Sequence, residues 1–223
     1  MNDFKDEKLK PGQISVLRPF GPTIGHVKIP EDLINKLNNY TDEVIKNEKK
    51  SDDLDHGKKL AGNVTQEFKL EKDFMKEVGW IDFLAKGAGN WIKYSTGETI
   101  TKFDIISSWV VRQFQNEYNP VHWHGGHISG VGYLKVPKTL GKPLQKAKNI
   151  NPNGNLQLIH GTKMFLSNSE IKIIPEVGNF YFFPNYMMHT VYPFSDTNEE
   201  RRSISFNAWI DSNIFDVYGS PKI

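Results

Sequence analysis

The stretch NPVHWHGGHISGVGYLKV, residues 119–136, contains three of the seven histidines of the chain within two β-prone runs and the turn between them. Side chains of an extended strand alternate between its faces, so His122 and His124 are expected on one face and Val121 and Trp123 on the other. Two imidazoles that point the same way can bind one metal ion. An isolated H-x-H is more often the polar face of a half-exposed strand, so a metal site also requires a third ligand.

Runs of the same β-prone kind fill the C-terminal half of the sequence. From Lys102 onward, segments rich in Val, Ile, Phe, Tyr and Trp are separated by turn residues; they are FDIISSWVVRQF, PVHWH, ISGVGYLKV, NLQLI, EIKII, NFYFF, HTVYPF and RRSISFNAWI. The stretch PKTLGKPLQKAKNINPNGN is expected to be a long loop between strands. The pattern predicts an antiparallel β-sandwich or barrel.

The N-terminal half mixes strands and helices. After a polar lead-in, ISVLRPFGPTIGHVKI is expected to form framing strands, and PEDLINKLNNYTDEVI fits an amphipathic helix with Pro30 in its first turn. EKKSDDLDHGKK is expected to be a charged connector. A second helical region is expected over roughly 71–95, although Gly79 interrupts its periodicity.

The length and this change of pattern indicate how the chain is organised. A chain of 223 residues can form one large domain with a buried core. We therefore predict a single domain over 1–223. Strands and helices of 1–101 precede a β core of 102–211, and the helices pack outside it.

The composition excludes several kinds of partner and of metal ligand. The 28 Lys and Arg against 26 Asp and Glu give a net charge of +2, which provides no field suited to a nucleic-acid backbone, so no nucleic-acid partner is expected. The chain has no cysteine, so a metal would be bound by N and O ligands. The polar N-terminus lacks a secretory pattern and no run approaches the ~20 apolar residues of a membrane span, so we expect a cytoplasmic protein without a membrane partner.

A third metal ligand and an anion-binding pair are candidates further along the chain. His189 stands at the start of HTVYPF, after a Pro-containing corner. Arg201 and Ser203 share one strand face, and a guanidinium beside a hydroxyl suits a buried dicarboxylate, although the same polar strip could be the solvent side of a sheet. Ser129 and Tyr133 also share a face and could add hydroxyls to that site.

The set H-x-H, SGVGYL, GNFYFFP, HTVYP and R-x-S-I-S-F-N resembles the 2-oxoglutarate and Fe(II)-dependent oxygenases, in particular a bacterial and phage branch related to the prolyl 4-hydroxylases. The resemblance covers roughly residues 105–210. It implies a double-stranded β-helix, or jelly roll, with N-terminal helices packed outside. Iron would be bound at one mouth of this barrel.

The resemblance implies that His122, His124 and His189 bind Fe(II). The usual ligand set in the superfamily is H-x-D…H, and His124 stands where the aspartate would be, so we expect a three-histidine site. A neutral third ligand leaves the iron one unit more positive. A rival assignment uses His127, three residues further on, as a ligand or as an acid or base that faces the substrate.

The same resemblance places the cosubstrate 2-oxoglutarate. Arg201 and Ser203 would bind its far carboxylate, and Tyr133, with Ser129, could add a hydroxyl. Arg201 is preferred to Arg202 because only Arg201 shares a face with Ser203.

The function that follows is an Fe(II)- and 2-oxoglutarate-dependent dioxygenase, expected to be a hydroxylase that couples oxidative decarboxylation of 2-oxoglutarate by O₂ to C–H hydroxylation. No catalytic residue is expected beyond the metal ligands. The alternatives are a cupin-like metal-binding barrel without 2-oxoglutarate and a degenerate jelly roll that serves as a binding protein. The substrate is expected to be a small molecule or a peptide, and the oligomeric state stays open. Trp109 and Trp123 are each expected in the core more than at the mouth of the site.

Overall fold

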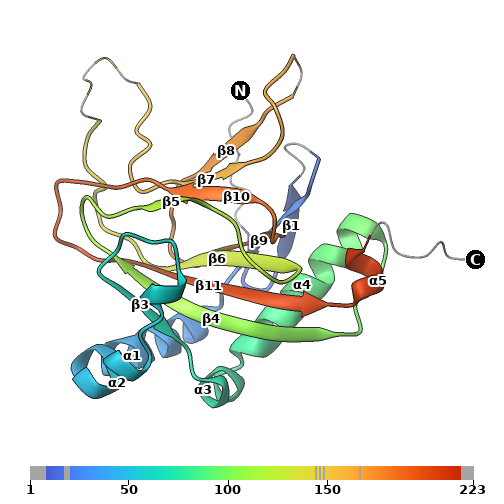
Figure 1. The fold of residues 1–223 in the computed structure, drawn as a ribbon, viewed down its shortest axis with the longest axis horizontal. Coiled ribbons are helices and arrows are strands. Elements are labelled where there is room, and N and C mark those ends of the chain that lie inside the picture. Colours follow the sequence, from blue (N-terminus) through green and yellow to red (C-terminus); the bar gives the residue numbers. More distant parts are fainter. Residues whose placement is uncertain are drawn as a thin grey trace, which may run out of the picture.

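The computed structural model describes residues 9–17, 21–143, 145, 147, 149–165 and 167–216. These residues contain two antiparallel β-sheets that face each other (Figure 1). The larger sheet has the strand order β1-β2-β9-β6-β11-β4-β3, and the smaller one has the order β5-β10-β7-β8. The prediction of a mainly β protein with two antiparallel sheets is therefore confirmed. The strands are β1 (Ile14–Leu17), β2 (Ile24–Lys28), β3 (Gln66–Lys69), β4 (Phe103–Gln113), β5 (Asn119–His122), β6 (Ile128–Lys135), β7 (Leu156–Ile159), β8 (Glu170–Ile173), β9 (Asn179–Pro184), β10 (Met188–Val191) and β11 (Arg201–Ile210).

Both faces of the larger sheet are buried. Ile204 and Phe206 on β11 pack into the core that this sheet shares with the helices. Tyr133 on β6 and Phe183 on β9 pack into the second core, between the two sheets. Because successive side chains alternate, the second face carries Arg201, whereas the first carries Arg202.

The helices lie on the outer side of the larger sheet (Figure 1). The helix predicted from Pro30 is confirmed as α1 (Glu31–Lys46), which buries an apolar stripe that includes Leu33 and Leu37. The predicted helical region of 71–95 is two helices, because Gly79 has a left-handed φ of 83° between them. The remaining helices are α2 (Glu48–Asp53), η1 (Gly57–Lys59), α3 (Lys72–Glu77), α4 (Trp80–Thr96) and α5 (Ser212–Phe215).

Two expectations for the N-terminal half need correction. The segment expected to be a charged connector contains α2 and η1. The two sheets are not confined to residues 102–211, because β1, β2 and β3 extend the larger sheet at both of its ends. The framing strands β1 and β2 were expected, whereas β3 was not predicted.

A glycine sets how closely α4 approaches the sheet. A Cβ at Gly87 would lie 2.6 Å from the ring of Phe182 on β9, closer than two carbon atoms can approach. The helix therefore packs with its backbone against an aromatic side chain of the larger sheet.

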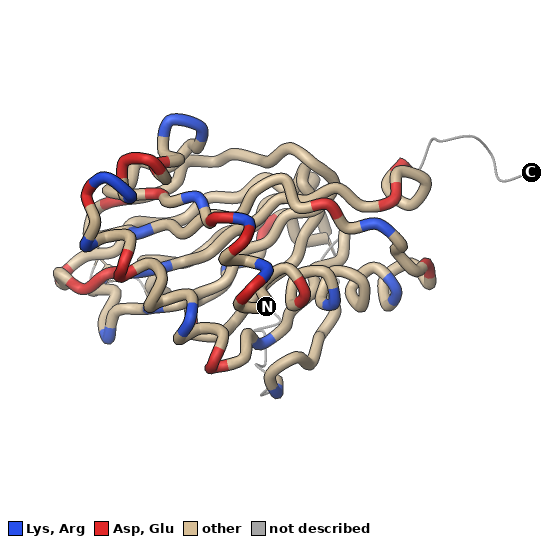
Figure 2. The backbone as a smooth tube through the Cα atoms, turned by 90° about the horizontal axis from the view of Figure 1, so that it is seen from below, with Lys and Arg blue, Asp and Glu red and all other residues tan. Residues whose placement is uncertain are grey.

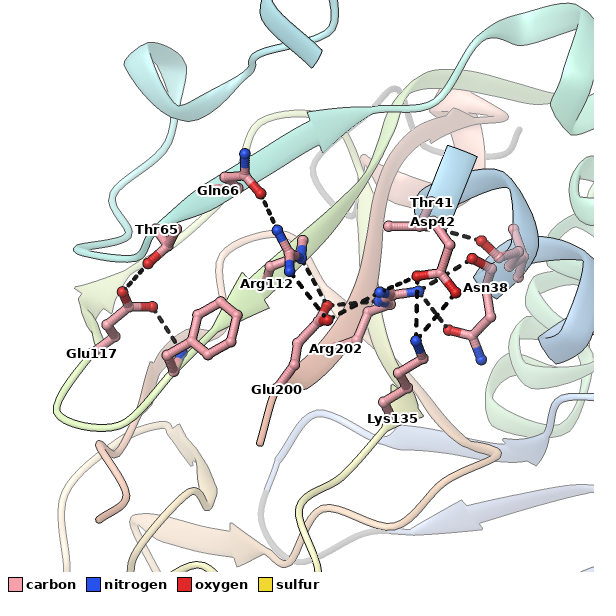
Figure 3. Close-up of polar contacts among 12 residues, drawn as sticks. Asn38, Thr41, Asp42, Thr65, Gln66, Arg112, Glu117, Lys135, Glu200 and Arg202 are labelled. Carbon is pink, nitrogen blue, oxygen red and sulfur yellow. Dashed lines mark hydrogen bonds and ion pairs between the residues drawn. The ribbon is translucent and has the colours of Figure 1, made fainter. Parts of the chain in front are cut away.

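A cluster of charges joins α1 to the same face of the sheet (Figure 3). Arg202 donates to Asp42 of α1 at 2.6 Å and to Glu200 at 2.7 Å. Lys135 also pairs with Asp42, and Arg112 pairs with Glu200 at 3.0 Å. The buried guanidinium of Arg202 is thus compensated by two carboxylates, which is the condition for burying a charge.

Charges of both signs are interspersed along the backbone seen from the helical side (Figure 2). Within the described residues, none of the helices combines the length and apolar character that a bilayer crossing requires.

Candidate functional site

Three histidines converge between the sheets. His122 and His189 are directly opposite each other in the antiparallel pair of β5 and β10, which lie side by side in Figure 1. Their ring centroids are 4.2 Å apart, and the ring of His124, just past the end of β5, is 4.9 Å from that of His189. One ring nitrogen from each of the three lies within 4.8 Å of the others. The structure brings together the three histidines that the sequence analysis predicted as metal ligands.

Backbone carbonyls orient two of these rings. Nδ1 of His122 is 2.7 Å from the carbonyl oxygen of Pro120, and Nδ1 of His189 is 2.9 Å from that of Met187. A carbonyl oxygen only accepts, so each Nδ1 carries the proton and each Nε2 is left with a free lone pair. Histidines that ligate metals are typically oriented in this way.

The histidines are held in their neutral form. Burial lowers the pKa of His124 to about 2 and that of His189 to about 3, and it also lowers the pKa of His122. Nε2 of His124 lies 3.1 Å from Nε2 of His189, so the two nitrogens face each other at hydrogen-bond distance. A cation that accepts neutral nitrogen ligands fits this donor set, and Fe(II) is such a cation.

His127 lies apart from this cluster. Its ring stacks on Phe215 at 3.9 Å, and its Nδ1 accepts a hydrogen bond from the backbone N–H of Ile210 at 3.2 Å. It is not among the three histidines whose nitrogens converge. The geometry therefore favours His124 over His127 as the third metal ligand.

Arg201 lies in the same cavity as the histidines, with unused donors. Its side chain is 1% exposed, and its Nη1 donates to Gln113 at 2.8 Å. Its Nε and Nη2 have no hydrogen-bond partner, and neither has the hydroxyl of Tyr133, whose ring centroid is 5.0 Å from Cζ of Arg201. Ser203 is opposite Tyr133 in the β11–β6 pair and lines the cavity. These buried, unsatisfied donors suit a carboxylate ligand such as that of 2-oxoglutarate.

Ser129 is not brought to this group. It is opposite Asn207 in the sheet, six residues along β11 from Arg201, and its hydroxyl donates to Asn207 at 2.8 Å. Ser129 and Tyr133 share a strand face as predicted, but this face also contains positions far from Arg201.

The cavity has one residue that the sequence did not suggest. Glu67 of β3 is 2% exposed, and burial, with the charge of Asp55, raises its pKa to about 7. The alternation in TQEFKL could have indicated a strand, but nothing in it marks Glu67 as facing the histidines. Trp109 lines the cavity from the core as expected, whereas Trp123 is 67% exposed, so its expected core position was wrong.

The sequence comparison agrees with this geometry. Residues 107–207 match the family model described as "Putative 2OG-Fe(II) oxygenase". The matched residues include the three histidines and Arg201, so this comparison confirms the resemblance inferred from the motifs. No curated protein matches the sequence.

Solved structures share the fold of this chain at low sequence identity. A prolyl-4-hydroxylase from Pseudomonas putida aligns with a TM-score of 0.54 and 13% identity over 84% of this chain and 91% of the other. A viral collagen prolyl hydroxylase from Paramecium bursaria Chlorella virus-1, solved with 2-oxoglutarate, gives 0.51 and 17% over 84% and 94%. The epimerase SnoN of nogalamycin biosynthesis gives 0.54 and 15% over 82% and 76%. The predicted jelly roll is confirmed.

Proposed function

We propose that this protein is an Fe(II)- and 2-oxoglutarate-dependent hydroxylase that binds Fe(II) through His122, His124 and His189. The observation that carries the proposal is the cavity itself, in which three neutral imidazoles and the unsatisfied donors of Arg201 face the same space. A cupin-like barrel that binds only a metal has no need of a buried arginine there. Bound Fe(II) would supply, with 2-oxoglutarate and O₂, the oxidising power for attack on a C–H bond.

Arg201, Ser203 and Tyr133 are proposed to bind the far carboxylate of 2-oxoglutarate. The guanidinium is already oriented by Gln113, so its Nε and Nη2 are held for a ligand with little further ordering. The hydroxyls of Ser203 and Tyr133 come from neighbouring strands of the same sheet. Apolar residues such as Val131, Leu156 and Phe183 complete the walls and keep water from competing for these donors.

The third histidine gives this site a different charge from the usual two histidines and one carboxylate. Without the carboxylate, the protein contributes no negative charge among the proposed ligands, so bound 2-oxoglutarate would provide the neutralising charge. We therefore expect Fe(II) and 2-oxoglutarate to bind with positive coupling, each raising the affinity for the other.

The reaction type, the substrate class and the cellular location are part of this proposal. Prolyl hydroxylases share this fold, and so does an epimerase, so C–H hydroxylation is our choice among the oxidations that such a site performs. We propose a peptide or a small molecule as the substrate and the cytoplasm as the location.

Anaerobic titration tests the function. Fe(II) followed by 2-oxoglutarate under argon should produce the weak visible charge-transfer band of the chelate. The band should be absent from His189→Ala and strongly reduced in Arg201→Ala at the same 2-oxoglutarate concentration. A wild-type protein that binds Fe(II) but gives no band at saturating 2-oxoglutarate would be a metal-binding barrel and not an oxygenase.

A further inference from the structure

Two buried acceptor oxygens in the cavity have no hydrogen-bond partner. They are Oε1 of Glu67 and Oδ1 of Asn119, and both residues line the cavity that contains the histidines and Arg201. Oε1 of Glu67 is buried without a donor, which is unfavourable for the ionised carboxylate, and the residue is only 2% exposed. A cationic donor that enters the cavity would stabilise the ionised form.

Both oxygens lie close to Gly62. A Cβ added to Gly62 would lie 2.9 Å from Oε1 of Glu67 and 3.0 Å from Oδ1 of Asn119, so a side chain there would collide with both acceptors. Glu67 belongs to β3 of the larger sheet and Asn119 to β5 of the smaller one, so the acceptors approach each other where the two sheets meet.

The Glu67 and Asn119 acceptors are next to the proposed 2-oxoglutarate site but do not coincide with it. The register places Tyr133, Ser203, Val111 and Glu67 in one row across β6, β11, β4 and β3. Their side chains share the face that looks toward the smaller sheet. Glu67 is two strands from Ser203, roughly 10 Å away. A molecule bound at Glu67 would thus be beside 2-oxoglutarate and not in its place.

The residues around Glu67 and Asn119 favour a ligand with a cationic group on an aliphatic chain. Leu60, Ala61 and Trp109 form apolar walls. Arg201 is the one Lys or Arg among the residues that line the cavity, and it donates to Gln113. Asp55 adds a second negative charge near Glu67.

Building on the proposed function, we infer that Glu67, with Asn119, is the specificity-determining acceptor of the substrate pocket and that the substrate carries an aliphatic ammonium or guanidinium group. The carboxylate binds the cationic nitrogen by charge-assisted hydrogen bonds, and the amide oxygen accepts a further one. The chain of the substrate then extends along the apolar walls toward the histidines, where a C–H bond is attacked.

The test uses n-butylguanidinium and n-butylurea, which have the same shape and differ in charge. Calorimetric titration of the protein loaded with Fe(II) and 2-oxoglutarate under argon should show the guanidinium binding about tenfold more tightly or better, as a charged hydrogen bond implies. Glu67→Gln, an isosteric change, should abolish this preference. Glu77→Gln removes the same charge from an exposed position of α3 and should retain it.

Two results would overturn the inference. They are equal affinities for the two probes in the wild-type protein and a preference that survives in Glu67→Gln. Fe(II) and 2-oxoglutarate affinities are measured separately on each variant, and their loss in Glu67→Gln would assign Glu67 to the cofactor site instead. Failure of the wild-type protein to bind 2-oxoglutarate would refute the proposed function, whereas the two probes can still be compared on the metal-free protein.

Discussion

Arg201 and Arg202 are consecutive on β11 and each is 1% exposed, yet they lie on opposite faces of the larger sheet. Arg201 faces the histidines, with Nε and Nη2 unsatisfied. Arg202 faces α1, where Asp42 and Glu200 compensate its charge (Figure 3). One guanidinium is therefore available to a ligand, and the other is committed to the fold.

The first prediction concerns this pair. Arg201→Lys keeps the charge but loses the planar fork, so the affinity for 2-oxoglutarate should fall about tenfold or more while the affinity for Fe(II) is retained. Arg202→Lys is the matched control and should leave both affinities unchanged. Anaerobic titration of the two variants with 2-oxoglutarate measures the difference. Equal affinities for Arg201→Lys and the parent protein would remove the main ground for an oxoglutarate site.

The second prediction separates the two candidate histidines. His124→Ala should weaken Fe(II) binding by about 100-fold or more, since it removes one of three converging nitrogens and even outer-shell changes cost about 10–100-fold. His127→Ala should bind Fe(II) normally, because its ring packs on Phe215 and its Nδ1 is used by the backbone of Ile210. Anaerobic Fe(II) titration of both variants decides between them, and the opposite result would restore the rival assignment.

The third prediction is a pH dependence of stability at Glu67. Burial raises its pKa from 4.5 to about 7 in the folded protein, so between these values the folded state holds a proton that the unfolded state has lost. This carboxyl therefore destabilises the fold increasingly as pH rises from about 4.5 to 7, by an amount on the order of 2–4 kcal/mol. Glu67→Gln should gain stability relative to the parent at pH 8 and little at pH 4.5.

Urea denaturation of the metal-free parent and Glu67→Gln at the two pH values checks this. Glu77→Gln, on the exposed side of α3, should show no such difference. If the two pH values give the same change in unfolding free energy for Glu67→Gln, the carboxyl is not perturbed by its burial.

The fourth prediction tests the contact between α4 and the sheet. Gly87→Ala would place a Cβ 2.6 Å from the ring of Phe182 and should destabilise the protein by about 1–3 kcal/mol through overpacking. Gly89→Ala on the same helix meets no atom closer than 3.8 Å and should stabilise by about 0.5–1 kcal/mol through helix propensity. Urea midpoints of the two variants should move in opposite directions. Similar midpoints would mean that α4 is free to shift away from Phe182.

Much of the fold followed from local pattern. The strands of the C-terminal half and the helix after Pro30 have strong apolar periodicity, which fixes the side chains that face a core. Elements of the N-terminal half were harder to predict. The short strand β3 lies between η1 and α3, apart from the β-prone runs of the C-terminal half, and the interruption at Gly79 did not show that the helical region is two helices.

For the candidate site too, one part could be predicted from local sequence pattern and another part could not. Strand alternation by itself separated Arg201 from Arg202 and paired His122 with His124, because the face of a side chain depends only on the parity of its position. The sequence thus determined which side chains could meet, and the motif resemblance supplied the chemistry.

Tertiary structure decided which of them do meet. Register between distant strands places His189 opposite His122, directs Ser129 to Asn207, and sets Glu67 in one row with Val111 and Ser203. Register and sheet packing arise from contacts between segments far apart in the chain, so no local pattern contains them. The buried acceptors beside Gly62 and the unsatisfied donors of Arg201 exist only because the two sheets close over them.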